Sequence, residues 1–170
     1  MEHPVFRGVE LLDMAVQIER QGLEFYETCL GHATRPQVKE ALQFMAKEES
    51  RHIEVFTRMK NGLQHYELPE SYPGEMKAYV DCFVKDKVFL APEEGPDTIP
   101  LSDVALVIDA AIGFEQRSIL FYSAMKQVIS VSEGEVVEQV IVEEHSHIRR
   151  LLALRNALKH SQTAGDEGRG

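Results

Sequence analysis

The chain has 170 residues, with 18 Lys and Arg against 28 Asp and Glu, which gives a formal net charge of -10 at pH 7. This length fits one domain with a substantial core, and the acidic balance argues against a nucleic-acid surface, which needs clustered Lys and Arg. No apolar run reaches the roughly 18 residues of a membrane span, and the N-terminus lacks the basic-then-apolar order of a signal peptide. The only cysteines, Cys29 and Cys82, form no CxxC motif, so we expect buried thiols in a cytoplasmic protein. From the charge and the short apolar runs we expect that the protein binds neither nucleic acid nor membrane.

Two long amphipathic helices are predicted at the start of the chain. The first covers residues 9–30 and carries Glu19 and Tyr26 on its apolar face. Gly31 and Pro36 bracket a short turn, and the second helix covers 35–62, so the two helices should be antiparallel neighbours. The second helix has a core-facing stripe at helical spacing, made of Val38, Ala41, Leu42, Met45, Val55, Phe56 and Met59.

A Pro- and Gly-rich stretch from residue 62 to 100 separates these helices from the second half. It carries a shorter predicted helix over 75–90 and is longer than a hairpin needs. This suits a crossover that joins parallel helices across a bundle. We expect a homodimer, because the apolar residues of the crossover could cover the bundle or seat a second subunit; they include Tyr79, Phe83, Phe89 and Leu90.

Two further long helices are predicted over 102–129 and 133–160. The segment Ser132-Glu133-Gly134-Glu135 has the form of a capping box and predicts the start of the last helix. The tail over 161–170 is small and polar, which predicts disorder. Helices with apolar stripes must pack on one another, so residues 1–160 predict an all-α domain, a four-helix bundle with a long crossover between its second and third helices.

Both halves repeat one polar pattern inside their apolar stripes. A Glu on one helix is followed by a Glu-x-x-His pair on the next, and residues three apart project from one helical face. A single Glu-x-x-His is usually a solvated surface pair, but two pairs with two matching inward Glu favour a shared metal site. The six candidate ligands are Glu19, Glu49, His52, Glu115, Glu144 and His147.

Four buried carboxylates would repel one another unless cations or protons neutralise them. Two divalent metals bring four positive charges, which balance four ionised Glu while both His bind as neutral imidazoles. Ligation by many oxygens and one nitrogen per metal suits Fe or Mn better than a structural zinc site, although zinc competes well for the same ligands.

Residues beside the candidate ligands allow more than one interpretation. Glu48, Glu143 and His145 point about 100° or 200° away from the ligands on the helical wheel, so we expect them to face solvent, with His145 as an alternative secondary ligand. Tyr26 and Tyr122 each lie two turns after an inward Glu. They are either core tyrosines or donors that orient a ligand carboxylate near the reaction, and both roles are compatible.

Two small residues each follow an inward Glu by about one turn. Gly22 and Ser118 would leave room beside the metals for a diatomic or peroxide molecule. They would equally permit close packing of the helices.

The doubled motif resembles the ferritin-like di-iron carboxylate proteins, in which a Glu from each of two helices meets a Glu-x-x-His from each of the other two. Over residues 9–160 the chain looks most like the rubrerythrin branch, given its short helices, long crossover and Glu-to-Tyr spacing. The resemblance implies two Fe ions per chain, with Glu49 and Glu144 as bridging ligands. It also implies two pairs of terminal ligands, Glu19 with His52 and Glu115 with His147.

Two features depart from the fuller rubrerythrins. The sequence shows no rubredoxin domain with four Cys around one iron, so the resemblance implies an external electron donor such as a rubredoxin-like protein. Fuller members also carry an extra Glu one turn before the third-helix ligand, where this sequence has Ile112. This weakens the case for a redox-linked metal shift and for efficient peroxidase activity.

Three functional hypotheses follow from the resemblance and the predicted site. The leading one is a non-haem di-iron oxidoreductase that reduces hydrogen peroxide or dioxygen, with a role in oxidative stress. The second is an iron-binding protein, either a ferroxidase or an iron carrier. The third is an interaction module that a structural metal stabilises.

Overall fold

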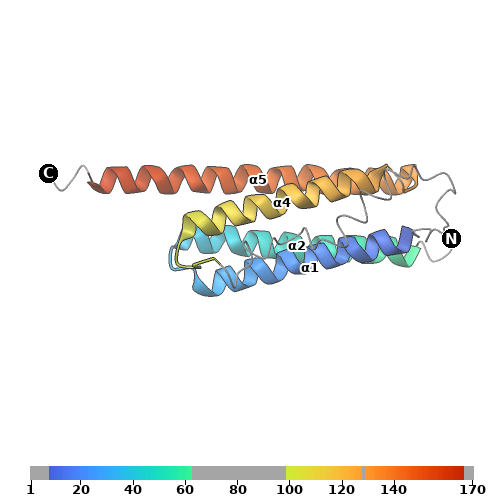
Figure 1. The fold of residues 1–170 in the computed structure, drawn as a ribbon, viewed down its shortest axis with the longest axis horizontal. Coiled ribbons are helices and arrows are strands. Elements are labelled where there is room, and N and C mark those ends of the chain that lie inside the picture. The colour runs from blue at the N-terminus through green and yellow to red at the C-terminus, as the bar shows by residue number, and fades with distance from the viewer. Residues whose placement is uncertain (1–7, 63–98, 128, 167–170) are drawn as a thin grey trace, which may run out of the picture.

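The computed structural model describes residues 8–62, 99–127 and 129–166, and within these ranges the regular structure is entirely α-helical. Four helices pack as a bundle (Figure 1). This architecture confirms the all-α four-helix bundle predicted from the sequence. The helices are α1 Gly8–His32, α2 Pro36–Gly62, α4 Val104–Lys126 and α5 Val131–Asp166.

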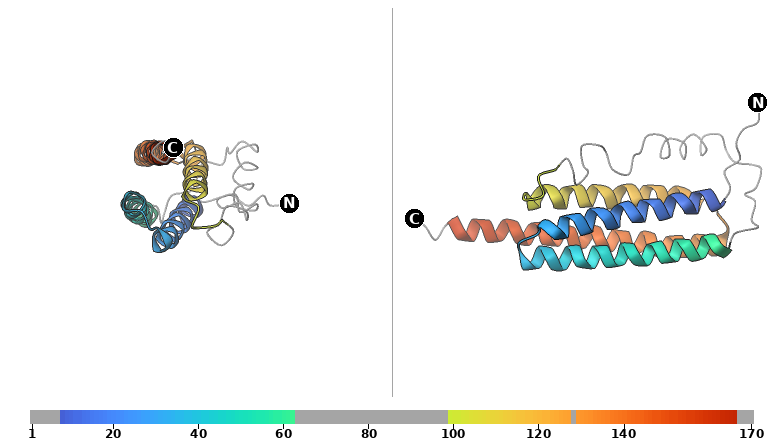
Figure 2. Two further views of the ribbon diagram at one scale, coloured as in Figure 1. Left: turned by 90° about the vertical axis from the view of Figure 1, so that its left-hand side faces the viewer. Right: turned by 90° about the horizontal axis from the view of Figure 1, so that it is seen from below.

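The bundle is made of two antiparallel hairpins, α1 with α2 and α4 with α5, and packing is most extensive within each hairpin. Seen along its axis, α2 and α5 form one side of the bundle and α1 and α4 form the other (Figure 2). Helices α2 and α4 run in the same direction, so the end of α2 and the start of α4 lie at opposite ends of the bundle (Figure 1). The helix predicted over 75–90, its apolar residues and Cys82 lie outside the described residues.

The last two helices start within two residues of the positions predicted from the sequence. Asp103 caps α4, and its carboxylate accepts from the backbone N–H groups of Ala105 at 3.0 Å and Leu106 at 3.3 Å. In α5 the cap is Ser130, whose hydroxyl accepts from the backbone N–H of Glu133 at 3.4 Å and donates to the Glu133 carboxylate at 2.8 Å. The predicted box at 132–135 was wrong by two residues, because the Ser-x-x-Glu pattern occurs twice in overlapping registers.

Helix α5 continues to Asp166 and extends beyond the ends of the other three helices (Figure 1). Residues 161–166, which we expected to be disordered, are therefore helical. The remainder of the predicted tail, 167–170, lies outside the described residues. Among the described helices, none is long and apolar enough to cross a membrane.

Two apolar clusters occupy the interior, one toward each end of the bundle. The first includes Leu11, Leu12, Phe56, Phe121 and Met125. The second includes Phe25, Val38, Leu42, Val107 and Leu151. The middle of the bundle lies between these clusters, so any polar group that points inward there is removed from water on both sides.

Cys29 belongs to the second cluster and is a free thiol. Burial raises its pKa to about 11, so the sulfur stays protonated at neutral pH. It is the ordinary buried thiol that the sequence predicted.

Candidate metal centre

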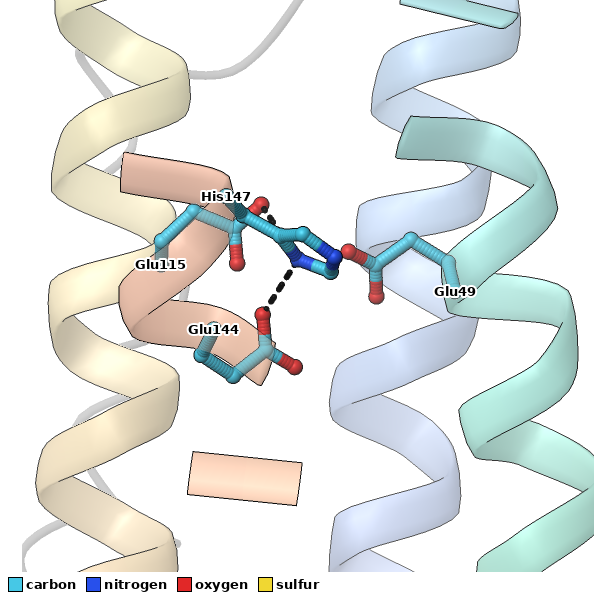
Figure 3. Close-up of side chains that lie close together, drawn as sticks. All are labelled: Glu49, Glu115, Glu144 and His147. Carbon is cyan, nitrogen blue, oxygen red and sulfur yellow. Dashed lines mark hydrogen bonds and ion pairs between the residues drawn. The ribbon is translucent and has the colours of Figure 1, made fainter. Parts of the chain in front are cut away.

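Six polar side chains meet in the middle of the bundle, and each is at most 2 % exposed. Every helix contributes, because each inward-facing position continues the apolar stripe of its own helix. Figure 3 shows four of the six, from α2, α4 and α5, pointing toward one another. These six are the residues that the sequence predicted as ligands, namely Glu19 on α1, Glu49 and His52 on α2, Glu115 on α4, and Glu144 and His147 on α5.

The six side chains form two overlapping groups of potential ligand atoms, and the atoms of each group lie within 4.8 Å of one another. Glu49 belongs to both groups. Glu144 also reaches both histidines, with Oε1 2.9 Å from His52 Nδ1 and Oε2 2.8 Å from His147 Nδ1. The groups are Glu19, Glu49 and His52, and Glu49, Glu115, Glu144 and His147.

Several of these atoms are buried without a hydrogen-bond partner among the described residues. A buried polar atom left unsatisfied costs about 1–3 kcal/mol, and more when it is charged. The donor set therefore fits a pair of cations; the unsatisfied atoms are Glu19 Oε2, both carboxylate oxygens of Glu49 and Glu115 Oε2.

Protons take the place of cations in the metal-free protein. Burial, followed by the carboxylates of Glu19 and Glu115, raises the pKa of Glu49 well above its usual value. The pKa of Glu115 is also raised well above its usual value, first by burial and then by Glu144. These two carboxyl groups therefore hold protons far more readily than exposed ones do.

The histidines and Glu144 shift in the opposite sense, toward their charged forms. Burial lowers the pKa of His52, but Glu144 and Glu19 outweigh it and raise the pKa to about 11. In the same way Glu115 and Glu144 raise the pKa of His147 to about 9 against the effect of burial. Burial alone would raise the pKa of Glu144, but His147 and His52 hold it below its usual value. Metal binding must displace the imidazole protons, because a ligating imidazole is neutral.

Two fully buried tyrosines connect the halves of the bundle. The Tyr26 hydroxyl donates to Glu115 Oε1, and the Tyr122 hydroxyl donates to Glu19 Oε1. Burial, together with the neighbouring carboxylate, raises the pKa of each tyrosine well above its usual value, so both remain donors. In each carboxylate one oxygen is held by a tyrosine, and the other oxygen is buried without a hydrogen-bond partner among the described residues.

Glu143 contacts His52, a role that the sequence did not predict. Its Oε2 lies 2.9 Å from His52 Nε2, the ring nitrogen that points away from the centre. Arg51 pairs with Glu143 and also with Glu48, at 2.9 Å in the latter case. Both carboxylates are partly exposed, so they reach solvent as expected, but both are also paired with Arg51. The helical wheel of one helix could not show that packing of α2 against α5 brings Glu143 over His52. The exposed side chain of His145 does not reach the centre.

Replacing Glu143 should weaken metal binding, because a carboxylate on the outer nitrogen fixes the orientation of a ligating imidazole. We expect Glu143→Ala to lose about 10–100-fold in metal affinity, measured by competition with a chromophoric chelator. Glu48→Ala is the matched control, since it removes the other partner of Arg51 and leaves the His52 contact intact. Equal losses in both variants would show that the effect depends on Arg51 instead.

Gly22 allows a close approach between α1 and its neighbours. A Cβ atom at this position would lie 2.6 Å from Phe114 Cε1 and 2.9 Å from Glu49 Oε2. Ser118 is buried, and its hydroxyl donates to the backbone carbonyl of Phe114 at 3.2 Å. Of the two interpretations, these contacts favour close packing, since the space beside Gly22 is filled by the Phe114 ring and the Glu49 carboxylate.

The variant Gly22→Ala should displace Phe114 and Glu49 together. We expect it to lower the free energy of unfolding by about 1–3 kcal/mol, the usual effect of overpacking, and to reduce the metal content. Chemical denaturation and metal analysis measure the two effects. Gly31→Ala is the control, because it lies in the same helix and nothing lies within 4 Å of its added Cβ; a loss of metal there would contradict this explanation.

The bundle and its centre define a class of protein. Four helices with two Glu-x-x-His pairs facing two further Glu form the architecture of the ferritin-like carboxylate proteins. The chain matches the rubrerythrin family over residues 10–155 and belongs to that family, which confirms the resemblance seen in the sequence.

The fold is similar to that of a protein from Thermotoga maritima described as a ferritin-like diiron-carboxylate protein. The two structures align with a TM-score of 0.62 at 22 % sequence identity, over 91 % of this chain and 98 % of the other. No curated protein matches the sequence significantly.

Proposed function

We propose that this protein is a non-haem di-iron oxidoreductase that reduces hydrogen peroxide or dioxygen with electrons from an external donor. The observation that carries the proposal is the buried centre, in which six ligand-type side chains converge and leave oxygens without partners. When bound, two iron ions would supply electrons and positive charge that stabilises developing negative charge on oxygen. Manganese or zinc could occupy the same ligands.

The ligand roles follow from which groups each side chain reaches. We assign Glu49 and Glu144 as bridging ligands, because Glu49 belongs to both ligand groups and Glu144 contacts both histidines. The first metal would be completed by Glu19 and His52, and the second by Glu115 and His147.

Other residues of the chain prepare the site for this reaction. Tyr26 and Tyr122 hold Glu115 and Glu19 by one oxygen each, so these carboxylates present a fixed second oxygen. The apolar clusters on both sides keep bulk water away, which strengthens electrostatic interactions inside the site. Hydrogen peroxide would take up two electrons from the donor and two protons from solvent to give two waters.

Metal analysis and an anaerobic ferrous titration test the metal proposal, and peroxide consumption with an added electron donor tests the activity. We expect about two irons per chain, as for other di-iron bundles, and peroxide consumption that stops when the metal is removed. An iron centre that binds but does not consume peroxide or dioxygen would overturn the enzyme proposal.

Iron handling without peroxide turnover is the second candidate function, and Ile112 favours it. This side chain packs against the second apolar cluster, so the described part of the centre has four carboxylates and no extra one at this position. Many irons retained per chain would support a ferroxidase or iron carrier. A metal that never changes its oxidation state would instead indicate a structural role in an interaction module.

A further inference from the structure

The centre is connected to solvent by polar side chains on the side of the bundle formed by α2 and α5 (Figure 2). Apolar clusters lie toward both ends of the bundle, and fully buried aromatic side chains back the opposite side, namely Tyr26, Tyr122 and Phe114. On the α2–α5 side, the carboxylate of Glu143, whose side chain is 36 % exposed, contacts His52 directly. Among the described residues, polar groups therefore run from the surface to the centre here without an apolar layer between them.

A second group of ligand-type atoms lies on this side, outside the centre. Glu48, His52 and Glu143 each offer one atom, and these atoms lie within 4.8 Å of one another. His52 is fully buried, and its Nδ1 lies 2.9 Å from Glu144 Oε1 in the centre, while its Nε2 lies 2.9 Å from Glu143 Oε2. Two carboxylates and an imidazole are ligands that bind iron, manganese and zinc. The His52 ring therefore lies between the centre and this outer group.

The outer group already surrounds a cation, the guanidinium of Arg51. Its Nη2 donates to Glu48 Oε2 at 2.9 Å and to Glu143 Oε2, and it lies 3.4 Å from His52 Nε2. Arginine only donates, so its approach to Nε2 forms no hydrogen bond while that nitrogen donates to Glu143. A metal ion at this point would instead use the lone pair of Nε2 as well as both carboxylates. The geometry therefore suits a metal ion better than the guanidinium that occupies it.

Arg51 can leave this position at little cost. Its side chain is 42 % exposed, and exposed ion pairs add little net stability because water solvates both charges. Arg51 also lines a groove between α1 and α2 together with Glu27 and Glu54, so a displaced guanidinium has other carboxylates near it. A divalent ion brings twice the charge of the guanidinium to the same two carboxylates, which favours the exchange.

We propose that Glu48, Glu143 and His52 Nε2 form an outer site for a divalent metal ion, which Arg51 occupies when no ion is bound. A ferrous ion from solvent displaces the guanidinium, and the proton on Nε2 is released to solvent. The ion then moves from the outer site to the centre on the other side of the His52 ring, and Arg51 returns. The inference rests on the metal centre of the proposed function and is independent of peroxide reduction.

The outer site is tested by counting zinc ions in a protein whose centre is impaired. Glu49→Gln removes a carboxylate that belongs to both ligand groups of the centre. Adding Arg51→Gln to this variant should let it retain about one more zinc ion per chain in equilibrium dialysis, because the competing guanidinium is gone. Adding Glu48→Ala as well should remove that ion. Circular dichroism checks that each variant is folded.

Arg58→Gln in the same background is the control, because it removes the same charge from an exposed position two turns further along α2. It should add no zinc. An extra ion in this control, no extra ion with Arg51→Gln, or an extra ion that persists without Glu48 would overturn the outer site.

Entry through the outer site is tested by stopped-flow loading of the otherwise unaltered, metal-free protein with zinc. Glu48→Ala should lower the loading rate at least about tenfold, because carboxylates at an entrance raise the local concentration of cations. The final zinc content should not change, since the centre keeps all six of its ligands. Glu40→Ala removes the same charge from an exposed position of α2 and should load at the unaltered rate.

An unchanged loading rate in Glu48→Ala, or equal slowing in both variants, would overturn entry by this route. Zinc does not change its oxidation state, so neither experiment depends on turnover. Failure of the zinc experiments sinks the outer site alone, whereas an iron-loaded protein that consumes neither peroxide nor dioxygen sinks the proposed function alone.

Discussion

The variants Glu49→Ala and Glu144→Ala are expected to lose both metal ions, whereas Glu19→Ala and Glu115→Ala should each lose only one. This difference is expected because Glu49 and Glu144 each contact both ligand groups. Glu49 is a member of both groups, and Glu144 contacts the histidine of each group. Removing a shared carboxylate takes a ligand and a negative charge from both positions at once. Metal content after anaerobic iron loading should fall from about two to near zero in the first pair of variants and to about one in the second.

Folding of the metal-free variants must be checked separately by circular dichroism. In Glu144→Ala the protonated His52 and His147 lose a carboxylate partner, so some loss of stability is expected. The amide variants Glu49→Gln and Glu144→Gln keep the volume of the side chain and remove only its charge. Retention of one metal by a well-folded Glu49 or Glu144 variant would contradict the bridging assignment.

The six residues of the centre could be predicted because their signal lies within single helices. A polar residue such as Glu49 that continues an apolar stripe can be read from the spacing of Met45 and Phe56 on the same helix. The same spacing predicted that Tyr26 and Tyr122 face inward, either as core tyrosines or as donors to a ligand carboxylate. It could not show that each tyrosine bonds the carboxylate of the opposite half.

The features that could not be predicted depend on how one helix is positioned against another. Glu143 lies over His52 only because α5 packs beside α2 in one register, and the wheel of α5 alone places Glu143 toward solvent. The same holds for Gly22, whose small size matters because of Phe114 on α4 and Glu49 on α2. The doubled Glu in Glu48-Glu49 and Glu143-Glu144 was the available signal for a carboxylate behind a ligand, but it did not distinguish Glu143 from Glu48.

Metal should remove the pH dependence of stability that the buried histidines and carboxyl groups cause. In the metal-free protein His52 and His147 have pKa values of about 11 and about 9, against about 6.5 in the unfolded chain. Their stabilising contribution is full below pH 6.5 and is lost as the pH rises toward the folded values. Glu49 and Glu115, whose pKa values are also raised, act in the same direction. The contribution of Glu144, whose pKa is lowered, is already complete above its unfolded value and does not change in this window.

The free energy of unfolding of the metal-free protein should therefore fall between pH 6.5 and 9, by on the order of 1–3 kcal/mol per pH unit. The metal-loaded protein should not show this fall, because its ligating imidazoles and carboxylates carry no protons and the unfolded histidines are also neutral above about pH 7.5, so its stability should rise slightly near pH 6.5 and then level off. Ligand at about 100 times its dissociation constant adds roughly 2.7 kcal/mol of stability, which corresponds to a rise in Tm of about 5–10 °C for a chain of this size. The gap in Tm between metal-loaded and chelator-treated samples should widen from pH 6.5 to pH 9.

Thermal melts of the two samples across this pH range measure the effect, and proton release on metal addition, followed with a pH indicator in weak buffer, gives an independent reading. His145→Ala is the control, since this exposed histidine on α5 lies outside the centre and its removal should leave both trends unchanged. His147→Ala should remove part of the slope in the metal-free protein, because one raised imidazole pKa no longer contributes. A metal-free Tm that stays constant or rises between pH 6.5 and 9 would mean that protons do not neutralise the buried carboxylates, and that the histidines are already neutral before any metal arrives.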